Sequence, residues 1–148
     1  MSDDYQWFIE AMQKLEAASP EEKSPMSDAE VFEISVRIVS NKLISEGAEL
    51  LQVNSGLNSV PAIWFKRNDN LNYIVITTAR YPQKASPPDN TLAIQQHLSD
   101  QNANGYWVGV SLAHEFEVFD PEADEGMPLM KGFGVLPAVS DPVNLSSL

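Results

Sequence analysis

The sequence contains no cysteine, and this absence removes several kinds of chemistry at once. The chain cannot form disulfides, use a thiolate nucleophile or bind zinc or an iron–sulfur cluster through cysteine. No stretch approaches the roughly 18 apolar residues that a membrane-spanning helix requires. The amino terminus also lacks the basic and then apolar pattern of a secretion signal. We therefore expect a cytoplasmic protein that does not contact a membrane.

Basic side chains are scarce: 9 lysines and arginines face 21 aspartates and glutamates, giving a net charge of −12 and a pI near 4.3. Binding to nucleic acid depends on lysines and arginines that displace counterions from phosphates, so we expect no nucleic-acid partner. Two interpretations of the acidic charge remain open. It can keep a solvated surface soluble by repulsion, or it can complement a basic protein partner.

At 148 residues, the chain is long enough for one domain with a core of its own. We predict a single domain over residues 1–148. Within it, residues 1–25 are expected to form a helix and linker, residues 26–137 an α/β core, and residues 138–148 a tail that frays.

An apolar hairpin is expected to organise this domain. Residues 60–65 and 73–79 are β-branched and aromatic runs, and Asn68-Asp69-Asn70 between them is typical of a turn. The second run has no charged residue, so it is expected to be a central strand covered on both faces. We expect Trp64 or Phe65 to point into the core.

A first helix is predicted to begin at Asp3 or Asp4, and its apolar side is marked by four residues at three- and four-residue spacing: Tyr5, Phe8, Met12 and Leu15. Trp7 lies off this stripe. We interpret it as a residue at the rim of the helix contact.

Residues 28–46 carry conflicting patterns. Phe32, Ile34, Val36 and Ile38 alternate with polar residues, as in a half-buried strand. A capping-box pattern at residues 27–30 and a glycine at position 47 instead favour one helix of about 18 residues. We predict the helix and keep partial strand as the alternative.

The remaining elements complete the expected fold. We predict a strand at residues 48–53, a helix at residues 90–102, a strand at residues 106–113 parallel to a hairpin strand, and a short strand around residues 133–136. The fold class is therefore α/β: a single-domain sandwich with a mixed four- to five-stranded sheet covered by about three helices.

The succession of a helix, a three-stranded meander, a helix and a further strand resembles the core of the restriction-endonuclease-like superfamily, the PD-(D/E)xK nucleases. Some stretches are also similar to a group of small uncharacterised bacterial proteins, namely residues 61–66, 73–76, 120–124, 128–129 and 131–132. The likeness covers about residues 28–137.

The resemblance implies a metal site that this sequence lacks. In that superfamily, an acid on the second strand of the meander and a D/E-x-K triplet on the third hold the metal that activates water. Here the third strand, residues 73–79, has neither carboxylate nor lysine, and Lys66 stands alone on the second strand. The resemblance therefore points to a binding protein on a nuclease-like scaffold, because function belongs to sites and not to folds.

Other catalytic and metal-binding patterns are weak, so we expect no enzyme activity, cofactor or metal. His97 and His114 lack the spacing of metal ligands, and we expect both at the surface or capping an element. Asp120, Glu122 and Asp124 suggest a calcium loop, but Pro121 stands within the pattern and Lys131 where a bidentate glutamate should be.

The segment at residues 114–125 carries six acidic residues and no basic one, interleaved with apolar side chains. Charge around apolar anchors is typical of a steered protein interface. We therefore name eight candidate partner-binding residues: Glu115, Glu117, Phe119, Asp120, Glu122, Asp124, Glu125 and Met127. A loop packed on its own domain remains the alternative.

Two functional classes follow. The first is a non-catalytic acidic protein that binds a basic protein, for example a bacterial immunity protein that neutralises a cationic toxin. The second is a metal-dependent hydrolase with an unrecognised carboxylate site built from Glu49, Asp69 and Glu115, and an oligomer-forming or housekeeping domain is a further alternative. The sequence leaves the oligomeric state and the identity of any partner open.

Overall fold

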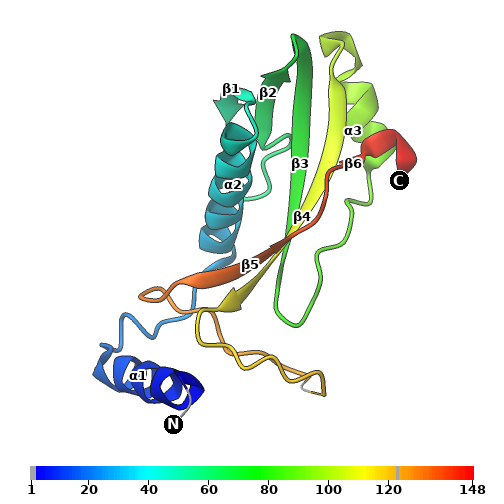
Figure 1. Cartoon of the computed structure of the whole chain (residues 1–148). Helices are drawn as coiled ribbons and strands as arrows, with labels where there is room; N and C mark the ends of the chain where they lie inside the picture. Colours follow the sequence, from blue (N-terminus) through cyan, green and yellow to red (C-terminus); the bar gives the residue numbers. More distant parts are fainter. Residues whose placement is uncertain (1–2, 123) are drawn as a thin grey trace.

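The protein folds around a six-stranded mixed sheet that has helices on both faces (Figure 1). The computed structural model describes residues 3–122 and 124–148, with side chains from residue 6 onward in those ranges. The helices are α1 (Asp3–Ala17), α2 (Asp28–Ser45), α3 (Thr91–His97) and the 3-10 turns η1 (Ser99–Gln101) and η2 (Leu145–Ser147). The strands are β1 (Glu49–Val53), β2 (Ile63–Arg67), β3 (Asn70–Arg80), β4 (Asn104–His114), β5 (Val135–Val139) and β6 (Val143–Asn144).

The predicted hairpin is confirmed as β2 and β3, which pair antiparallel around the turn at Asn68 and Asp69. Strand β3 is central, between β2 and β4, and its apolar run is buried on both faces. Ile74 and Ile76 join the main core cluster under α2, while Tyr73 and Val75 join a second cluster on the opposite face. Side chains that alternate between two cores explain why this strand has no polar face.

The two aromatic residues of β2 divide between these faces. Phe65 is buried in the cluster under α2, whereas Trp64 is half-buried and stacks on Tyr73 at a ring-centroid distance of 5.3 Å on the other face. The prediction that one of the two points into the core is confirmed, and the residue is Phe65.

Helix α2 settles the ambiguity at residues 28–46 in favour of the helix. Ser27 and Glu30 form a capping box, and Gly47, at φ +91°, follows the end of the helix in a left-handed conformation. The alternating apolar residues that suggested a strand belong instead to a helix with a wide buried face, which includes Val31, Ser35 and Val39.

Strand β4 runs parallel to β3, as predicted, because α3 and the chain around it form the crossover between them. Helix α3 and η1 replace the single helix expected at residues 90–102. They cover the face opposite α2, where Ile94 packs in the second cluster with Trp107.

The carboxyl-terminal segment differs from the prediction that it frays. Val143 and Asn144 pair with Trp107 and Tyr106 of β4, and Leu145 is buried in the second cluster. This pairing adds β6 and makes six strands where four to five were expected. The single buried leucine that anchors the segment lies in a polar, proline-containing stretch, and such a stretch gives no periodic signal.

Helix α1 begins where predicted but presents a different side to the protein. Phe8 and Met12 of the predicted inward stripe are 51% and 41% exposed, whereas Ala11 is buried. Trp7 contacts Phe116 edge-on, at 6.1 Å between ring centroids, although it remains exposed. The side chain of Tyr5 lies outside the described residues. The apolar residues of α1 lie on more than one side of the helix, so their spacing alone does not predict which side faces the protein.

Among the described residues, no helix combines the length and the hydropathy needed to cross a bilayer.

Candidate functional site: an acidic arm and its base

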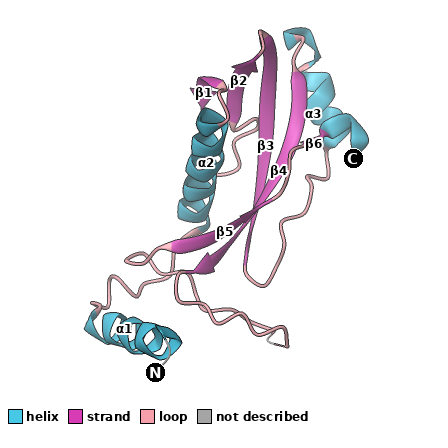
Figure 2. Cartoon of the chain, viewed as in Figure 1, coloured by secondary structure: helices cyan, strands magenta, loops and turns pink. Residues whose placement is uncertain are grey.

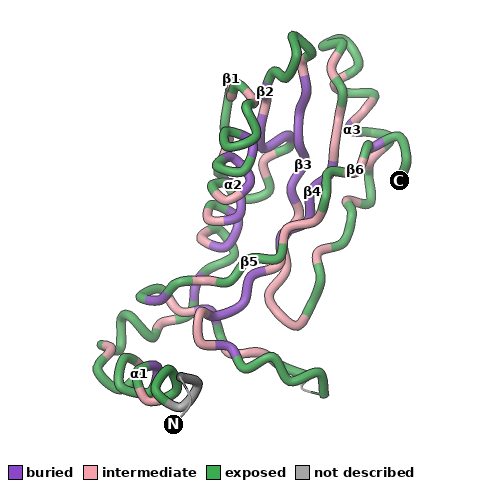
Figure 3. The backbone as a smooth tube through the Cα atoms, viewed as in Figure 1, coloured by how far each residue is buried: buried purple, intermediate pink, exposed green. Residues whose placement is uncertain are grey.

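The predicted acidic segment belongs to a long excursion between β4 and β5, residues 115–134, which we call the acidic arm. It leaves the end of β4, extends away from the sheet, and returns to β5 beside the linker between α1 and α2, where Met130 pairs with Pro25 (Figures 1 and 2). The described residues of the arm form no helix or named strand. Apart from its two ends, most of the described arm is exposed (Figure 3).

Two of the predicted partner-binding carboxylates instead form contacts that stabilise the base of the arm. Glu115 accepts a hydrogen bond from the N–H of Gly134 and pairs with Lys14 of α1 at 3.2 Å. The Gly134 bond, together with Lys14, lowers the pKa of Glu115 below its usual value of 4.5, although partial burial opposes this shift. Glu117 is only 9% exposed, and its carboxylate accepts from the N–H of Met127 at 2.5 Å. Both side chains close the arm on itself, so we reassign them from the interface to its support.

The other predicted carboxylates lie at the tip of the arm and are exposed: Asp120, Glu122, Asp124 and Glu125. Asp120 accepts from the N–H of Glu122 at 2.9 Å and so shapes a local turn. Within the described part of the chain, none of these four carboxylates forms an ion pair. Their charge is therefore available to a partner.

Two large apolar side chains accompany this charge. Val118 is 65% exposed and Phe119 is 55% exposed. One edge of the Phe119 ring rests against Tyr81, with 5.0 Å between centroids and an interplanar angle of 82°. Phe119 is thus oriented by the domain but not covered by it.

A groove of about 390 Å³ separates the arm from the segment that follows β3. Tyr81 and Pro82 line one side, and Asp124, Glu125 and Met127 line the other. Gly126 lets the arm approach this closely, because a Cβ atom there would lie 2.7 Å from the carbonyl oxygen of Tyr81. Arg80 also lines the groove, and its charge is paired with Asp28 at 2.9 Å. The structure therefore places two carboxylates, an aromatic ring and a paired arginine around one groove.

His114, which the sequence placed at the surface, is fully buried at the base of the arm. Its ring packs against Phe116 and Phe133, and its Nδ1 accepts from the N–H of Phe116 at 3.0 Å. The prediction was wrong because one side of the ring is covered by Phe133, from the returning half of the arm, which no local pattern connects to β4.

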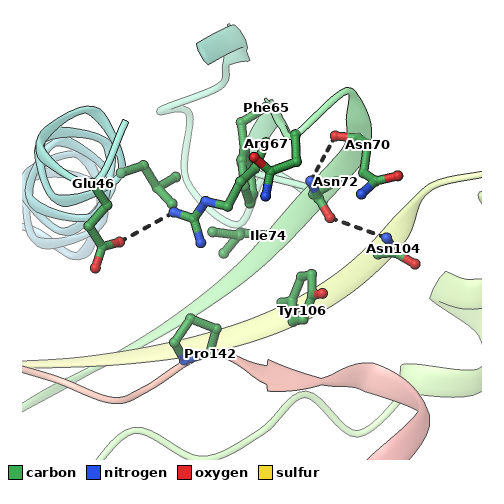
Figure 4. A pocket seen from close by; sticks show the side chains of 11 residues that line it. Glu46, Phe65, Arg67, Asn70, Asn72, Ile74, Asn104, Tyr106 and Pro142 are labelled. Atoms are coloured by element: carbon green, nitrogen blue, oxygen red, sulfur yellow. Dashed lines mark hydrogen bonds and ion pairs between the residues drawn. The ribbon is translucent and has the colours of Figure 1, made fainter. Parts of the chain in front are cut away.

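Sequence reasoning missed a second concave site at the opposite end of the sheet (Figure 4). This pocket of about 240 Å³ has Phe65, Ile74 and Tyr106 at its apolar side. Its polar side carries an ion pair between Arg67 and Glu46 and four asparagines, namely Asn68, Asn70, Asn72 and Asn104. Asparagines at residues 68–72 were interpreted only as a turn, although Asn72 interrupts an apolar strand and could have marked the site.

The side-chain amide of Asn72 has partners within this pocket. Asn72 donates to the carbonyl oxygen of Asn70 at 2.9 Å and accepts from Asn104 at 3.4 Å (Figure 4). The arrangement accounts for a buried polar side chain on a central strand.

The carboxylates of the hydrolase alternative are not brought together. Glu49 of β1 lies opposite Lys66 of β2 in the sheet, near the β2–β3 turn that contains Asp69. Glu115 instead follows the far end of β4. Strand β4 alone separates these ends by about 30 Å at 3.3 Å per residue. Among the described residues, no group of three or more histidines, aspartates and glutamates is placed to hold a metal ion.

Residues 29–140 match the model of a family described as Domain of unknown function (DUF8840). The chain belongs to the DUF8840 family. The DUF8840 match includes α2, strands β1 to β5 and the whole acidic arm, and leaves α1 outside. No curated protein and no solved structure matches the chain.

Proposed function

We propose that the protein is a non-catalytic binding protein whose acidic arm engages a basic protein partner. The observation that carries this proposal is the tip of the arm, where Phe119 is 55% exposed among four exposed carboxylates that lack ion pairs in the described structure. A buried salt-bridge network would favour a structural role for these acids. In the described residues, the ion pairs of the arm, Lys14–Glu115 and Glu30–Lys131, are partly exposed and lie near its two ends, and the tip carboxylates take part in neither.

The two kinds of side chain have different roles in binding. The carboxylates raise the association rate by attracting a positively charged surface, and this effect weakens as salt screens it. Phe119 and Val118 supply apolar area that is buried on contact and slows dissociation. In the groove, a lysine or arginine of the partner would meet the Asp124 and Glu125 carboxylates beside the Tyr81 ring, where cation–π attraction adds to charge pairing.

The partner class that we propose is a basic macromolecule of the kind that an immunity protein neutralises, a cationic bacterial toxin. A net charge of −12 supports this choice because it favours fast capture of a strongly positive protein. The resemblance to nuclease-like scaffolds remains a prediction, and the proposal does not depend on it.

Affinity capture from the native cell tests the proposal. The immobilised full-length protein is compared with a variant that carries Glu122→Ser, Asp124→Ser and Glu125→Ser. We expect the wild type to enrich a basic protein at about 0.1 M salt and to release it near 1 M, where the Debye length falls from about 10 Å to about 3 Å. The arm variant should capture much less of it.

A matched control distinguishes an effect of the arm's own carboxylates from an effect of the protein's net charge. Asp89→Ser, Asp100→Ser and Asp141→Ser remove three exposed charges elsewhere, so both variants have the same net charge. Capture should be retained in this control. Equal capture by wild type, arm variant and control, or equal loss in the two variants, would overturn the assignment of the interface to the arm.

A further inference from the structure

His114 stands at the junction between the sheet and the acidic arm, and it is fully buried. Its Nδ1 accepts from the N–H of Phe116 at 3.0 Å, so in the neutral ring the proton is on Nε2. Within the described structure, Nε2 is buried without a hydrogen-bond partner. The site accommodates one uncharged tautomer and offers no acceptor for a second ring proton.

The surroundings of the ring join three parts of the molecule. Phe116 from the outgoing half of the arm and Phe133 from the returning half flank it, with centroids at 5.7 Å and 5.0 Å. Lys14 of α1 lies over both phenyl rings, at 5.3 Å and 5.4 Å from their centroids. Trp7 of α1 also contacts Phe116. Helix α1 is therefore docked on the same aromatic cluster that buries His114.

We propose that His114 is an acid-sensitive latch, which holds the outgoing half of the acidic arm and α1 on the end of the sheet while its ring is neutral. The returning half is held separately, by Leu129 in the main core. When the ring takes up a proton from solvent at Nδ1, the acceptor for the Phe116 N–H is lost. The imidazolium then has two N–H donors in a buried aromatic cluster, and solvating them requires the cluster to open.

The charged groups that face the ring favour opposite states. Burial and Lys14 favour the neutral ring, while Glu115 and Glu117 at the base of the arm favour the protonated ring. Burial is the largest of these influences, and the pKa of His114 lies below its usual value of 6.5.

The sign of the pH effect follows from this direction. The open arm binds a proton more readily than the closed arm, so closure is complete above about pH 6.5 and is lost as the pH falls toward the lowered pKa. The lowered pKa of Glu115 makes its own contribution fade only below about pH 4.5. Glu117 also faces the ring, so the signals of His114 itself, and not the pH interval alone, identify the titration of the histidine.

Opening of the latch would also regulate partner binding, because the base of the arm positions the tip that contacts the partner. That consequence rests on the proposed function. Opening itself does not, since it is a property of the free protein.

A nuclear magnetic resonance titration of the free full-length protein tests the latch between pH of about 7.5 and about 4.5. We expect the Nε2–H tautomer at the upper end and a His114 midpoint below 6.5. The Phe116 amide and the Trp7 indole should shift with the same midpoint. The indole of Trp107, which donates to Thr77 at 2.8 Å in the second cluster, should remain constant.

Two variants assign the transition. In His114→Asn, the side-chain oxygen can replace Nδ1 as acceptor but does not titrate, so the Trp7 and Phe116 signals should stay flat. His97→Asn removes the exposed histidine of α3 and should leave the transition intact. If His114→Asn does not fold, the wild-type and His97→Asn titrations decide. The latch is overturned by a His114 midpoint at or above 6.5, or by Trp7 and Phe116 signals that stay constant while His114 titrates.

Discussion

The sheet under α2 and the acidic arm are stabilised by different interactions. The main core is a continuous apolar cluster in which residues from α2 pack on residues from β2, β3 and β4. The returning half of the arm shares in that core, since Leu129 is buried there and its backbone pairs with residues 22–26. The outgoing half and the tip depend instead on polar contacts, chiefly those of Glu115 and Glu117, and on the aromatic cluster around His114. The comparison implies that the outgoing half and the tip can change or open while the sheet stays folded, because regions with few buried contacts open at lower free energy than the core.

The largest expected effect is in the core. Phe65→Ala should lower the free energy of unfolding by about 3–5 kcal/mol, because it leaves a cavity under α2. For a domain of this size, that corresponds to a melting-temperature loss of about 6–20 °C. Trp64→Ala is the matched control, with an expected cost of about 1–2 kcal/mol since Trp64 is half-buried. Similar melts for wild type and Phe65→Ala in circular dichroism would show that the hairpin is peripheral.

A smaller effect is expected where the arm closes on itself. Glu117→Ala removes the acceptor of the Met127 N–H, a charge-assisted hydrogen bond worth about 1.5–3 kcal/mol. Amide exchange at Met127 should therefore quicken by about tenfold or more. The amides of β3 should exchange at the wild-type rate, as should Met127 in the exposed-tip control Glu122→Ala. Equal acceleration in β3 would mean that arm and sheet unfold as one unit.

The contact between α1 and the arm is predicted to be weaker still. Lys14→Met removes a partly exposed ion pair with Glu115 and a cation over two phenyl rings, contributions of about 1 kcal/mol or less each. Trp7 fluorescence should shift toward that of a solvated indole, with little change in melting temperature. Arg37→Met, which removes an exposed ion pair on α2, should leave Trp7 unchanged. A loss of stability as large as that of Phe65→Ala would place α1 in the core.

No effect is expected in nucleic-acid assays. With magnesium or manganese, the protein should neither cleave nucleic acid nor bind it appreciably at physiological salt, because β3 carries no D/E-x-K triplet and the net charge is −12. Plasmid nicking that requires metal and disappears in Glu49→Ala would contradict this expectation.

The sequence predicts the two regions unequally. The apolar runs of β2 and β3, the capping box at Ser27 and the glycine after α2 are local signals, and each is confirmed. The arm lacks such signals. Glu117 and Glu122 lie in the same acidic segment, and the carboxylate of Glu117 is buried by its bond to the Met127 N–H, ten residues further along the chain. His114 is likewise buried by Phe133, which the chain brings back only after the whole arm. Local patterns do not specify where a long irregular segment returns.

The claim that the tip of the arm binds a basic partner is tested most directly by association kinetics. The association rate constant of the captured basic partner is measured against salt for the wild type, the arm variant and the control with Asp89, Asp100 and Asp141 changed to serine. We expect the arm variant to melt within about 2 °C of the wild type, because exposed substitutions cost little. It should associate more slowly, with a flattened dependence on salt, while the control keeps the wild-type slope. Identical slopes for the two variants would contradict the account and move the interface from the arm to another acidic surface, such as the amino-terminal third.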